Sequence, residues 1–170
     1  GRAFVLFTSF RHLHALALMM KGWIGDQGWL FLEQGGRLSR ERMLEKFRAS
    51  GKAVLFGAAS FWEGVDVPGE ALSCVVITRL PFAVPDTPLE KARTDEVQKA
   101  GGNAFADLSL PEAVLRLKQG FGRLLRHSDD SGSITILDAR VLGSSYGRSF
   151  LKALPRCRVF VDGVEQEDYT

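Results

Sequence analysis

The sequence predicts an α/β fold in which a mainly parallel sheet lies between two layers of helices. Short apolar runs alternate with stretches of helical periodicity along the whole chain, as repeated strand–helix units require. The chain has 170 residues, of which 45% are hydrophobic and 25% charged, the usage of one globular domain with a full core. Because no apolar run reaches the roughly 18 residues that span a bilayer, we expect no membrane contact.

Each predicted strand is a short apolar run bounded by turn residues or by a helical stretch. Ala3–Phe7 contains no polar side chain and is expected to be buried. The predicted strands are Ala3–Phe7, Trp29–Leu32, Ala53–Ala58, Ser73–Thr78, Gly132–Asp138 and Arg158–Val161.

The predicted helices place their apolar residues on one face. Ser39 is suited to cap the second helix, because a serine hydroxyl accepts an N–H of the first turn. Pro111 suits the first position of the fourth helix. The predicted helices are His12–Met20, Ser39 to about Ala49, Leu89–Ala100, Pro111 to about Arg126, and Ser145–Leu154.

We expect a single domain over residues 1–170, with an irregular insertion at about 82–110 on one edge of the sheet. Residues 81–88 carry three prolines, and the run Gly101-Gly102-Asn103 breaks the helix that precedes it. In open parallel sheets, ligands bind beyond the carboxyl ends of the strands. The expected working surface is therefore formed by the loops after Phe7, Ala58, Thr78 and Asp138.

Charge and cysteine content exclude some classes of protein. The formal net charge is only +2, so any basic surface for nucleic acid must be local. Cys74 and Cys157 are too isolated for a zinc site or a disulfide framework. The three histidines have no ligand partners in the sequence, so we predict no metal site. These features favour a cytoplasmic protein.

The segment QGFGRLLR, residues 119–126, carries the strongest chemical signal. On a helix, Gln119, Arg123 and Arg126 share one face, because they are four and seven residues apart. Two guanidinium groups at this spacing suit a polyphosphate, which accepts paired hydrogen bonds. Gly120 and Gly122 cost about 1 kcal/mol each in a helix, which indicates a close approach to its backbone. The alternative is a solvated basic face.

Two further segments follow predicted strands. In FWEGVDVPG, residues 61–69, carboxylates flank a glycine that lets backbone approach a ligand. Its tryptophan could stack on a base, although core packing is the commoner role. Thr8, Ser9 and Phe10 follow the first strand, where hydroxyls can cap a helix or hold a phosphate. Taken alone, the first segment is more typical of a tight turn with exposed acids, and the second of an ordinary helix cap.

In this order and spacing, LFTSF, FWEGVDVPG and QGFGRLLR resemble motifs IV, V and VI of superfamily 2 helicases. The FWEGVD form with QGFGRLLR is similar to the DinG group, the bacterial relatives of XPD. The segment ITRLPF, residues 77–82, matches the strand and turn usual after motif V. The resemblance covers Ala3 to about Leu154 and implies a RecA-like three-layer domain with a sheet of about five to seven strands.

The resemblance also implies roles for individual residues. The group facing the triphosphate would be Gln119, Arg123 and Arg126, with the arginines as fingers. The group bordering the nucleotide would be Glu63, Gly64 and Asp66. The group near the DNA strand would be Thr8, Ser9 and Phe10, with Trp62 as a candidate base-stacking residue.

The departures from a complete helicase are as informative as the matches. There is no G-x-x-x-x-G-K-[ST] phosphate loop, since Gly51-Lys52 is followed by alanine, and there is no Asp-Glu-x-His segment for Mg²⁺. In the resembling family both belong to an N-terminal motor domain, which this chain lacks. The cysteines of an iron–sulfur cluster would also lie in that missing domain. We therefore expect this chain to be inactive alone.

The resulting hypothesis is the C-terminal motor domain of an ATP-dependent DNA helicase, coupling ATP hydrolysis to 5′ to 3′ movement on single-stranded DNA and duplex unwinding in repair or replication. Its implied partners are ATP with Mg²⁺, single-stranded DNA and the N-terminal motor domain of the same protein. One alternative is a non-catalytic nucleic-acid-binding module that kept the fold. Another is a small-molecule enzyme, which would need a nucleophile or a dinucleotide loop; Gly120-Phe121-Gly122 lies within a predicted helix and does not meet that requirement.

Overall fold

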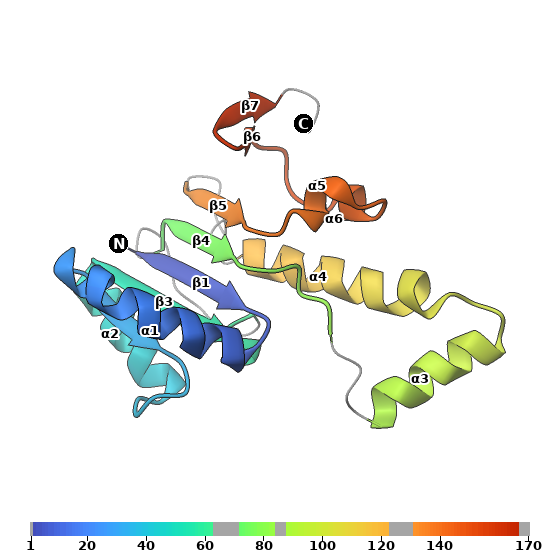
Figure 1. Cartoon of the computed structure of the whole chain (residues 1–170), viewed down its shortest axis with the longest axis horizontal. Helices are drawn as coiled ribbons and strands as arrows, with labels where there is room; N and C mark the ends of the chain where they lie inside the picture. Colours follow the sequence, from blue (N-terminus) through green and yellow to red (C-terminus); the bar gives the residue numbers. More distant parts are fainter. Residues whose placement is uncertain (1, 63–71, 84–87, 123–130, 167–170) are drawn as a thin grey trace.

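The computed structural model describes residues 2–62, 72–83, 88–122 and 131–166. It contains one five-stranded sheet in the order β2-β3-β1-β4-β5, and every neighbouring pair is parallel (Figure 1). The strands of this sheet are β1 (Ala3–Phe7), β2 (Leu30–Glu33), β3 (Ala53–Ala58), β4 (Cys74–Ile77) and β5 (Ser133–Ile136). The predicted α/β class and the parallel sheet are confirmed, as are the bounds of β1 and β3.

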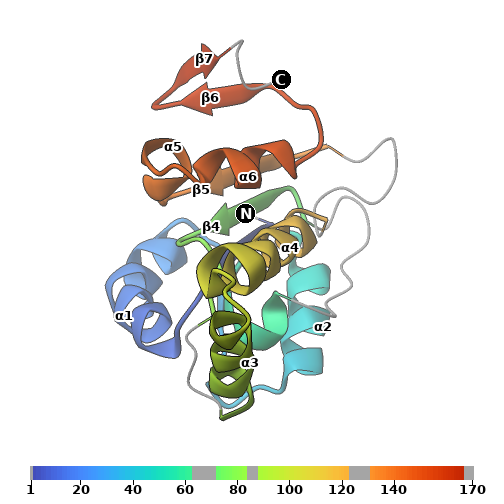
Figure 2. The same cartoon turned by 90° about the vertical axis from the view of Figure 1, so that its right-hand side faces the viewer.

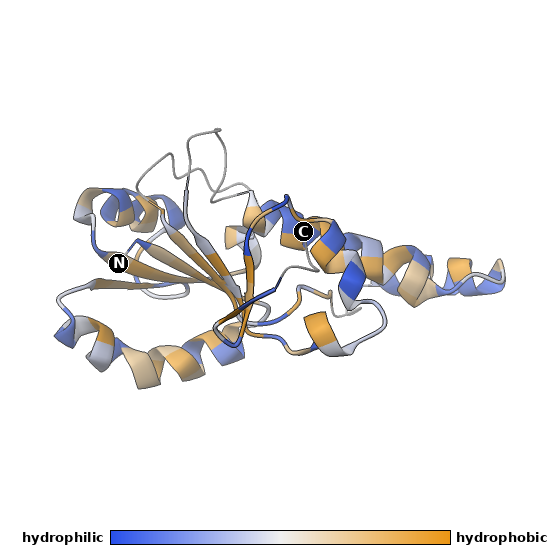
Figure 3. Ribbon diagram, turned by 90° about the horizontal axis from the view of Figure 1, so that it is seen from above, coloured by the Kyte–Doolittle hydropathy of each residue, from blue (hydrophilic) through white to orange (hydrophobic). Residues whose placement is uncertain are grey.

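The central strands are the most apolar because both of their faces are covered. All six residues of β3 are buried, as are four of the five residues of β1. At the edges, β2 and β5 contain exposed and half-buried residues. Figure 3 shows the strands as a mainly apolar band between helices that carry both polar and apolar residues.

The helices form a layer on each face of the sheet (Figure 2). α1 (Phe10–Asp26) buries Leu13, Ala17 and Ile24 against one face. The opposite face is covered by α2 (Arg40–Ser50), α4 (Leu110–Phe121) and α6 (Gly147–Lys152). The predicted three-layer arrangement is therefore present.

Local signals set several helix ends. Ser39 caps α2 by accepting the N–H of Arg42 at 3.4 Å, as the sequence predicts. Ser9 caps α1 in the same way, accepting the N–H of His12, so this helix begins earlier than the predicted His12 and also ends later, at Asp26. α4 ends at Phe121 with Gly122 as its cap, and the rest of the predicted helix lies outside the described residues.

The segment predicted as an insertion is largely helical where it is described. α3 (Pro88–Lys99) has no buried residue and extends away from the sheet (Figure 1). A single π-helical turn, Phe105–Ser109, joins directly to α4. An ion pair between Arg93 and Glu112, at 3.1 Å, links α3 to α4.

Two predictions near the C-terminus are wrong in detail. The predicted helix Ser145–Leu154 is shorter, and a separate turn, α5 (Arg140–Gly143), precedes it. The predicted last strand does not join the main sheet: β6 (Val159–Val161) pairs with β7 (Val164–Gln166) as an antiparallel hairpin. Asp162 and Gly163 have φ of 49° and 85°, the conformation of a tight Asp-Gly hairpin turn.

Among the residues described, no helix is both long and apolar enough to cross a membrane. In the same residues, no group of three or more His, Cys, Asp and Glu side chains is placed to hold a metal ion.

Candidate functional site

The carboxyl ends of the central strands are tied together by side-chain hydrogen bonds. The hydroxyl of Thr78, after β4, donates to the carbonyl of Leu6 in β1 at 2.9 Å. The indole Nε1 of Trp62 donates to the carbonyl of Phe7 at 2.8 Å. These bonds hold the residues that follow β1, β3 and β4 at one edge of the sheet, where parallel sheets place their ligands.

The residues that follow β1 lie at this edge and are accessible. Thr8 is exposed and Ser9 is half-buried. The Ser9 hydroxyl serves as the cap of α1 and lies 3.2 Å from Nδ1 of His12. Ser9 therefore acts as a helix cap, one of the two roles that the sequence allows. The N-terminus of α1 is directed toward the same edge.

Phe10 presents its ring beside that of His14. The Phe10 side chain is 42% exposed, and the two ring centroids lie 6.0 Å apart with the planes 27° from parallel. His14 is held by Glu33 at the end of β2, with 2.5 Å between Nδ1 and Oε1. Gly35, at φ +94°, leaves room for the imidazole, since a Cβ there would lie 3.2 Å from its Cε1. The arrangement fixes an exposed aromatic ring at the edge of the sheet.

Trp62 does not lie on the surface as the stacking prediction requires. Its side chain is only 5% exposed and belongs to the core cluster beneath α2 and α4. The six-membered ring packs against Gly120 of α4, where a Cβ would lie 3.0 Å from Cζ3. The prediction of base stacking is corrected to core packing, because both the ring and its N–H are already engaged inside the domain.

The contact with Trp62 explains why residue 120, inside α4, is a glycine. The sequence predicts a close approach to this helix, and the approaching group is the indole of Trp62. Gln119 is exposed, whereas Ala113, Leu117 and Phe121 are buried. The amide of Gln119 is thus directed away from the packed face, as the helical spacing predicts. Gly120-Phe121-Gly122 lies at the end of a helix, not in the strand-to-helix turn of a dinucleotide site.

Half of the predicted site lies beyond what the structure describes. The predicted residues outside the described ranges are Glu63, Gly64, Asp66, Arg123 and Arg126.

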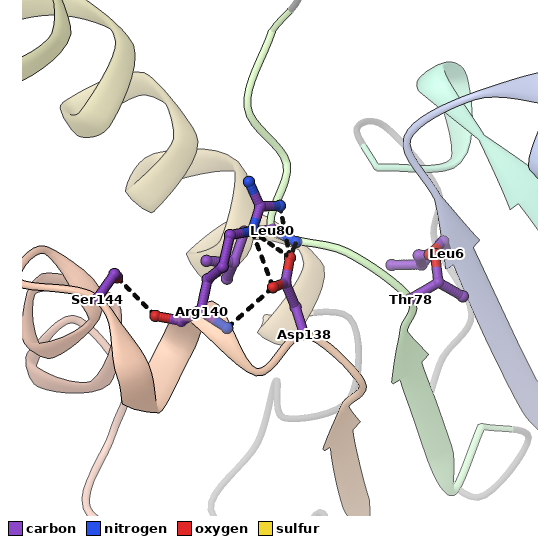
Figure 4. Close-up of polar contacts among 6 residues, drawn as sticks. All are labelled: Leu6, Thr78, Leu80, Asp138, Arg140 and Ser144. Atoms are coloured by element: carbon purple, nitrogen blue, oxygen red, sulfur yellow. Dashed lines mark hydrogen bonds and ion pairs between the residues drawn. The ribbon is translucent and has the colours of Figure 1, made fainter.

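Asp138 is a functional candidate that the sequence reasoning missed. It is the one buried charged residue among those described, at 8% exposure. Its carboxylate accepts the backbone N–H of Leu80 at 2.9 Å and the backbone N–H of Arg140 at 3.1 Å. The Arg140 guanidinium also donates to both carboxylate oxygens, with Nε 2.9 Å from Oδ1 and Nη2 2.6 Å from Oδ2 (Figure 4). The signal was an acid and an arginine two residues apart after a strand, but the Leu80 contact joins residues far apart in sequence.

The ion pair between Asp138 and Arg140 favours the charged form of the carboxylate. Hydrogen bonds from the Arg140 side chain lower the pKa of Asp138 to about 2, against the opposing effect of burial. The guanidinium also lies over the ring of Phe82, 5.7 Å from its centroid. Phe82 packs in turn on Phe105, Tyr146 and Phe150. The pair therefore connects the ends of β4 and β5 to this group of aromatic rings.

A five-stranded parallel sheet between helical layers is the architecture of a RecA-like domain. Residues 1–157 match the family described as helicase C-terminal domain. The chain belongs to this family.

Named relatives fit that assignment. The chain is 44% identical over 155 residues to the ATP-dependent DNA helicase YoaA of Haemophilus influenzae, covering 91% of this chain and 24% of that protein. It is 46% identical over 156 residues to the 3′-5′ exonuclease DinG of Bacillus subtilis, covering 91% and 17%. The chain therefore spans about a quarter or less of the length of these relatives.

Solved structures agree on the fold. An XPD helicase superposes with a TM-score of 0.66 at 22% identity, covering 89% of this chain and 27% of that one. A structure titled XPD apo superposes with a TM-score of 0.62 at 21% identity, covering 91% and 31%.

Proposed function

We propose that this chain is the C-terminal motor domain of an ATP-dependent DNA helicase of DinG type. The whole protein would couple ATP hydrolysis to 5′ to 3′ movement on single-stranded DNA and to duplex unwinding, in the cytoplasm, during repair or replication. The observation that carries the proposal is the family match over residues 1–157.

The described residues fit half of a nucleotide site. Gln119 projects from the exposed side of α4, where an amide can hydrogen-bond a phosphate or a ribose. Arg123 and Arg126 follow in the sequence and would supply the guanidinium groups that stabilise charge on the transferred phosphoryl group. Glu63, Gly64 and Asp66 would border the nucleotide.

ATP with Mg²⁺ would supply the phosphoryl group and the cation that neutralises it. The sequence has no phosphate loop and no Asp-Glu-x-His segment, so the Mg²⁺ ligands would come from an N-terminal motor domain of the same protein. Any iron–sulfur cluster would belong to that domain as well. This chain's residues would act by closing on the nucleotide, which is a conformational step.

The DNA strand would pass along the edge formed by Thr8, Ser9 and Phe10. Thr8 and Ser9 lie at the N-terminus of α1, the end of a helix that favours a phosphate. Phe10 adds an exposed ring on which a base could stack. Pure binding would not need the Gln-Arg-Arg cluster, which is why the motor is favoured over a non-catalytic module.

The test compares this chain with the whole protein. The whole protein should hydrolyse ATP in a manner stimulated by single-stranded DNA and should unwind a duplex with a single-stranded 5′ overhang. This chain alone should fold and show no turnover, with or without DNA. Turnover by the isolated chain that persists after repeated purification would count against the division of the site between two domains.

A further inference from the structure

The Trp62 side chain contacts two of the proposed functional segments and directly precedes the third. Its Nε1 donates to the carbonyl of Phe7, the residue before Thr8. Its ring packs on Gly120, the residue after Gln119. In the sequence it is followed at once by Glu63. A single buried side chain thus joins the proposed DNA edge to the helix that carries Gln119.

The contact leaves little freedom for the ring. A Cβ at Gly120 would lie 3.0 Å from Cζ3 of Trp62 and 3.4 Å from Cδ1 of Leu6, so any larger residue at this position would press on the ring. A buried indole N–H requires an acceptor, and the Phe7 carbonyl fulfils that need at 2.8 Å. Because close-packed interiors transmit displacement, a shift of the end of β1 has to move the ring or the helix.

We propose that Trp62 is a positioning residue that couples DNA binding to ATP turnover. This inference rests on the proposed function. Contact of DNA with Thr8 and Ser9 would displace the adjacent Phe7 carbonyl, and Trp62 would carry that displacement to α4. The position of Gln119, and of the arginines that follow it in the sequence, would then depend on whether DNA is bound.

The first readout is a ratio measured in the whole protein: ATP turnover with saturating oligo-dT divided by turnover without it. Trp62→Phe keeps a buried ring and removes the N–H that bonds Phe7. We expect the ratio to fall by about fivefold or more, since couplings between sites are usually worth about 5- to 150-fold. Gly120→Ala places a methyl group against the same ring from the side of α4 and should also lower the ratio.

The second readout is thermodynamic. The Kd for oligo-dT is measured with and without a non-hydrolysable ATP analogue, and in the wild-type protein the two values should differ by a measurable factor. Coupling between two binding sites is reciprocal, so Trp62→Phe should bring that factor toward one. Loss of fold would lower both turnover rates together and would leave both ratios near their wild-type values.

Phe47→Leu is the matched control. Phe47, on α2, is 1% exposed and belongs to the same core, and its ring centroid lies 4.7 Å from that of Phe4. It should lower the melting temperature without changing either ratio. The inference is overturned if Trp62→Phe leaves both ratios at wild-type values, or if Phe47→Leu lowers them equally. A wild-type protein with no DNA-stimulated turnover would instead contradict the proposed function.

Discussion

Arg140 donates to both carboxylate oxygens of Asp138, while the same carboxylate accepts the N–H of Leu80. The hydrogen bond from Leu80 thereby holds the end of β5 to the segment that follows β4, and the ion pair with Arg140 fixes the carboxylate that accepts it. Such pairs on a surface contribute little, but Asp138 is only 8% exposed. Because the Arg140 side chain is 49% exposed, removing the carboxylate leaves a guanidinium that water can solvate, and the stability lost comes mainly from the hydrogen bonds to the buried carboxylate.

Asp138→Asn should destabilise the chain by about 2 kcal/mol near pH 7. The shift of the Asp138 pKa from 3.8 to about 2 corresponds to that magnitude. Because the folded-state pKa is the lower one, the stabilisation is present above about pH 4 and is lost as pH falls through about 2. Urea unfolding across this range should show the two proteins converging in acid.

Asp95→Asn, on the exposed surface of α3, is the control and should match wild type at every pH. A wild-type advantage that does not change with pH would show that the Asp138 carboxylate contributes through shape rather than charge.

Phe10→Ala should weaken binding of single-stranded DNA roughly fivefold to a hundredfold, because stacking of one base on an aromatic ring is worth about 1–3 kcal/mol. An oligonucleotide with abasic positions keeps the phosphates and removes the bases. The penalty for those positions should be smaller in Phe10→Ala than in wild type. Fluorescence anisotropy measures both quantities.

The control is Trp23→Ala, which removes a ring that is 52% exposed on the same helix. It lies about 20 Å further along α1, at 1.5 Å per residue, and should leave DNA affinity unchanged. Equal affinity of Phe10→Ala and Trp23→Ala for both oligonucleotides would show that Phe10 does not contact DNA.

Arg123→Ala and Arg126→Ala should each reduce ATP turnover of the whole protein by roughly a thousandfold, the usual contribution of an arginine finger. Binding of ATP should weaken less, because these groups act mainly on transition-state charge. Lysine should not rescue either position, since a point charge cannot make the two-pronged contact. DNA-stimulated turnover is the measurement, and thermal melting checks the fold.

Arg42→Ala serves as the comparison, because this arginine lies on α2 in an exposed pair with Glu45. It should retain full turnover. If both finger variants also retained near wild-type turnover, the Gln119 face of α4 would be merely solvated and the proposed mechanism would fail.

DNA binding by this chain alone should be weak and should depend strongly on salt. A net charge of +2 allows few phosphate contacts, and half of the proposed groove would be missing. For about three contacts, raising salt from about 50 mM to about 200 mM should lower the affinity about tenfold or more. Tight binding that does not change with salt, again by anisotropy, would contradict a mainly electrostatic interaction.

Local sequence was sufficient where the physical cause is local. β1 and β3 are continuous apolar runs, so burial on both faces of a parallel sheet follows from composition alone. The Ser39 cap follows from a hydroxyl that bonds the N–H three residues on. The Asp162-Gly163 turn was also local and could have been predicted, since this dipeptide favours the hairpin that β6 forms with β7.

Tertiary structure decided the residues whose partners are distant in the sequence. Trp62 is followed by acids and glycine, which suggests exposure, yet it packs between Phe7 and Gly120, which lie more than fifty residues before and after it in the sequence. Asp138 acquires its low pKa from Arg140 nearby, but its burial and its bond to Leu80 depend on β4 and β5 pairing. Such contacts join residues that lie more than fifty positions apart in the sequence, and no local pattern of side chains encodes them.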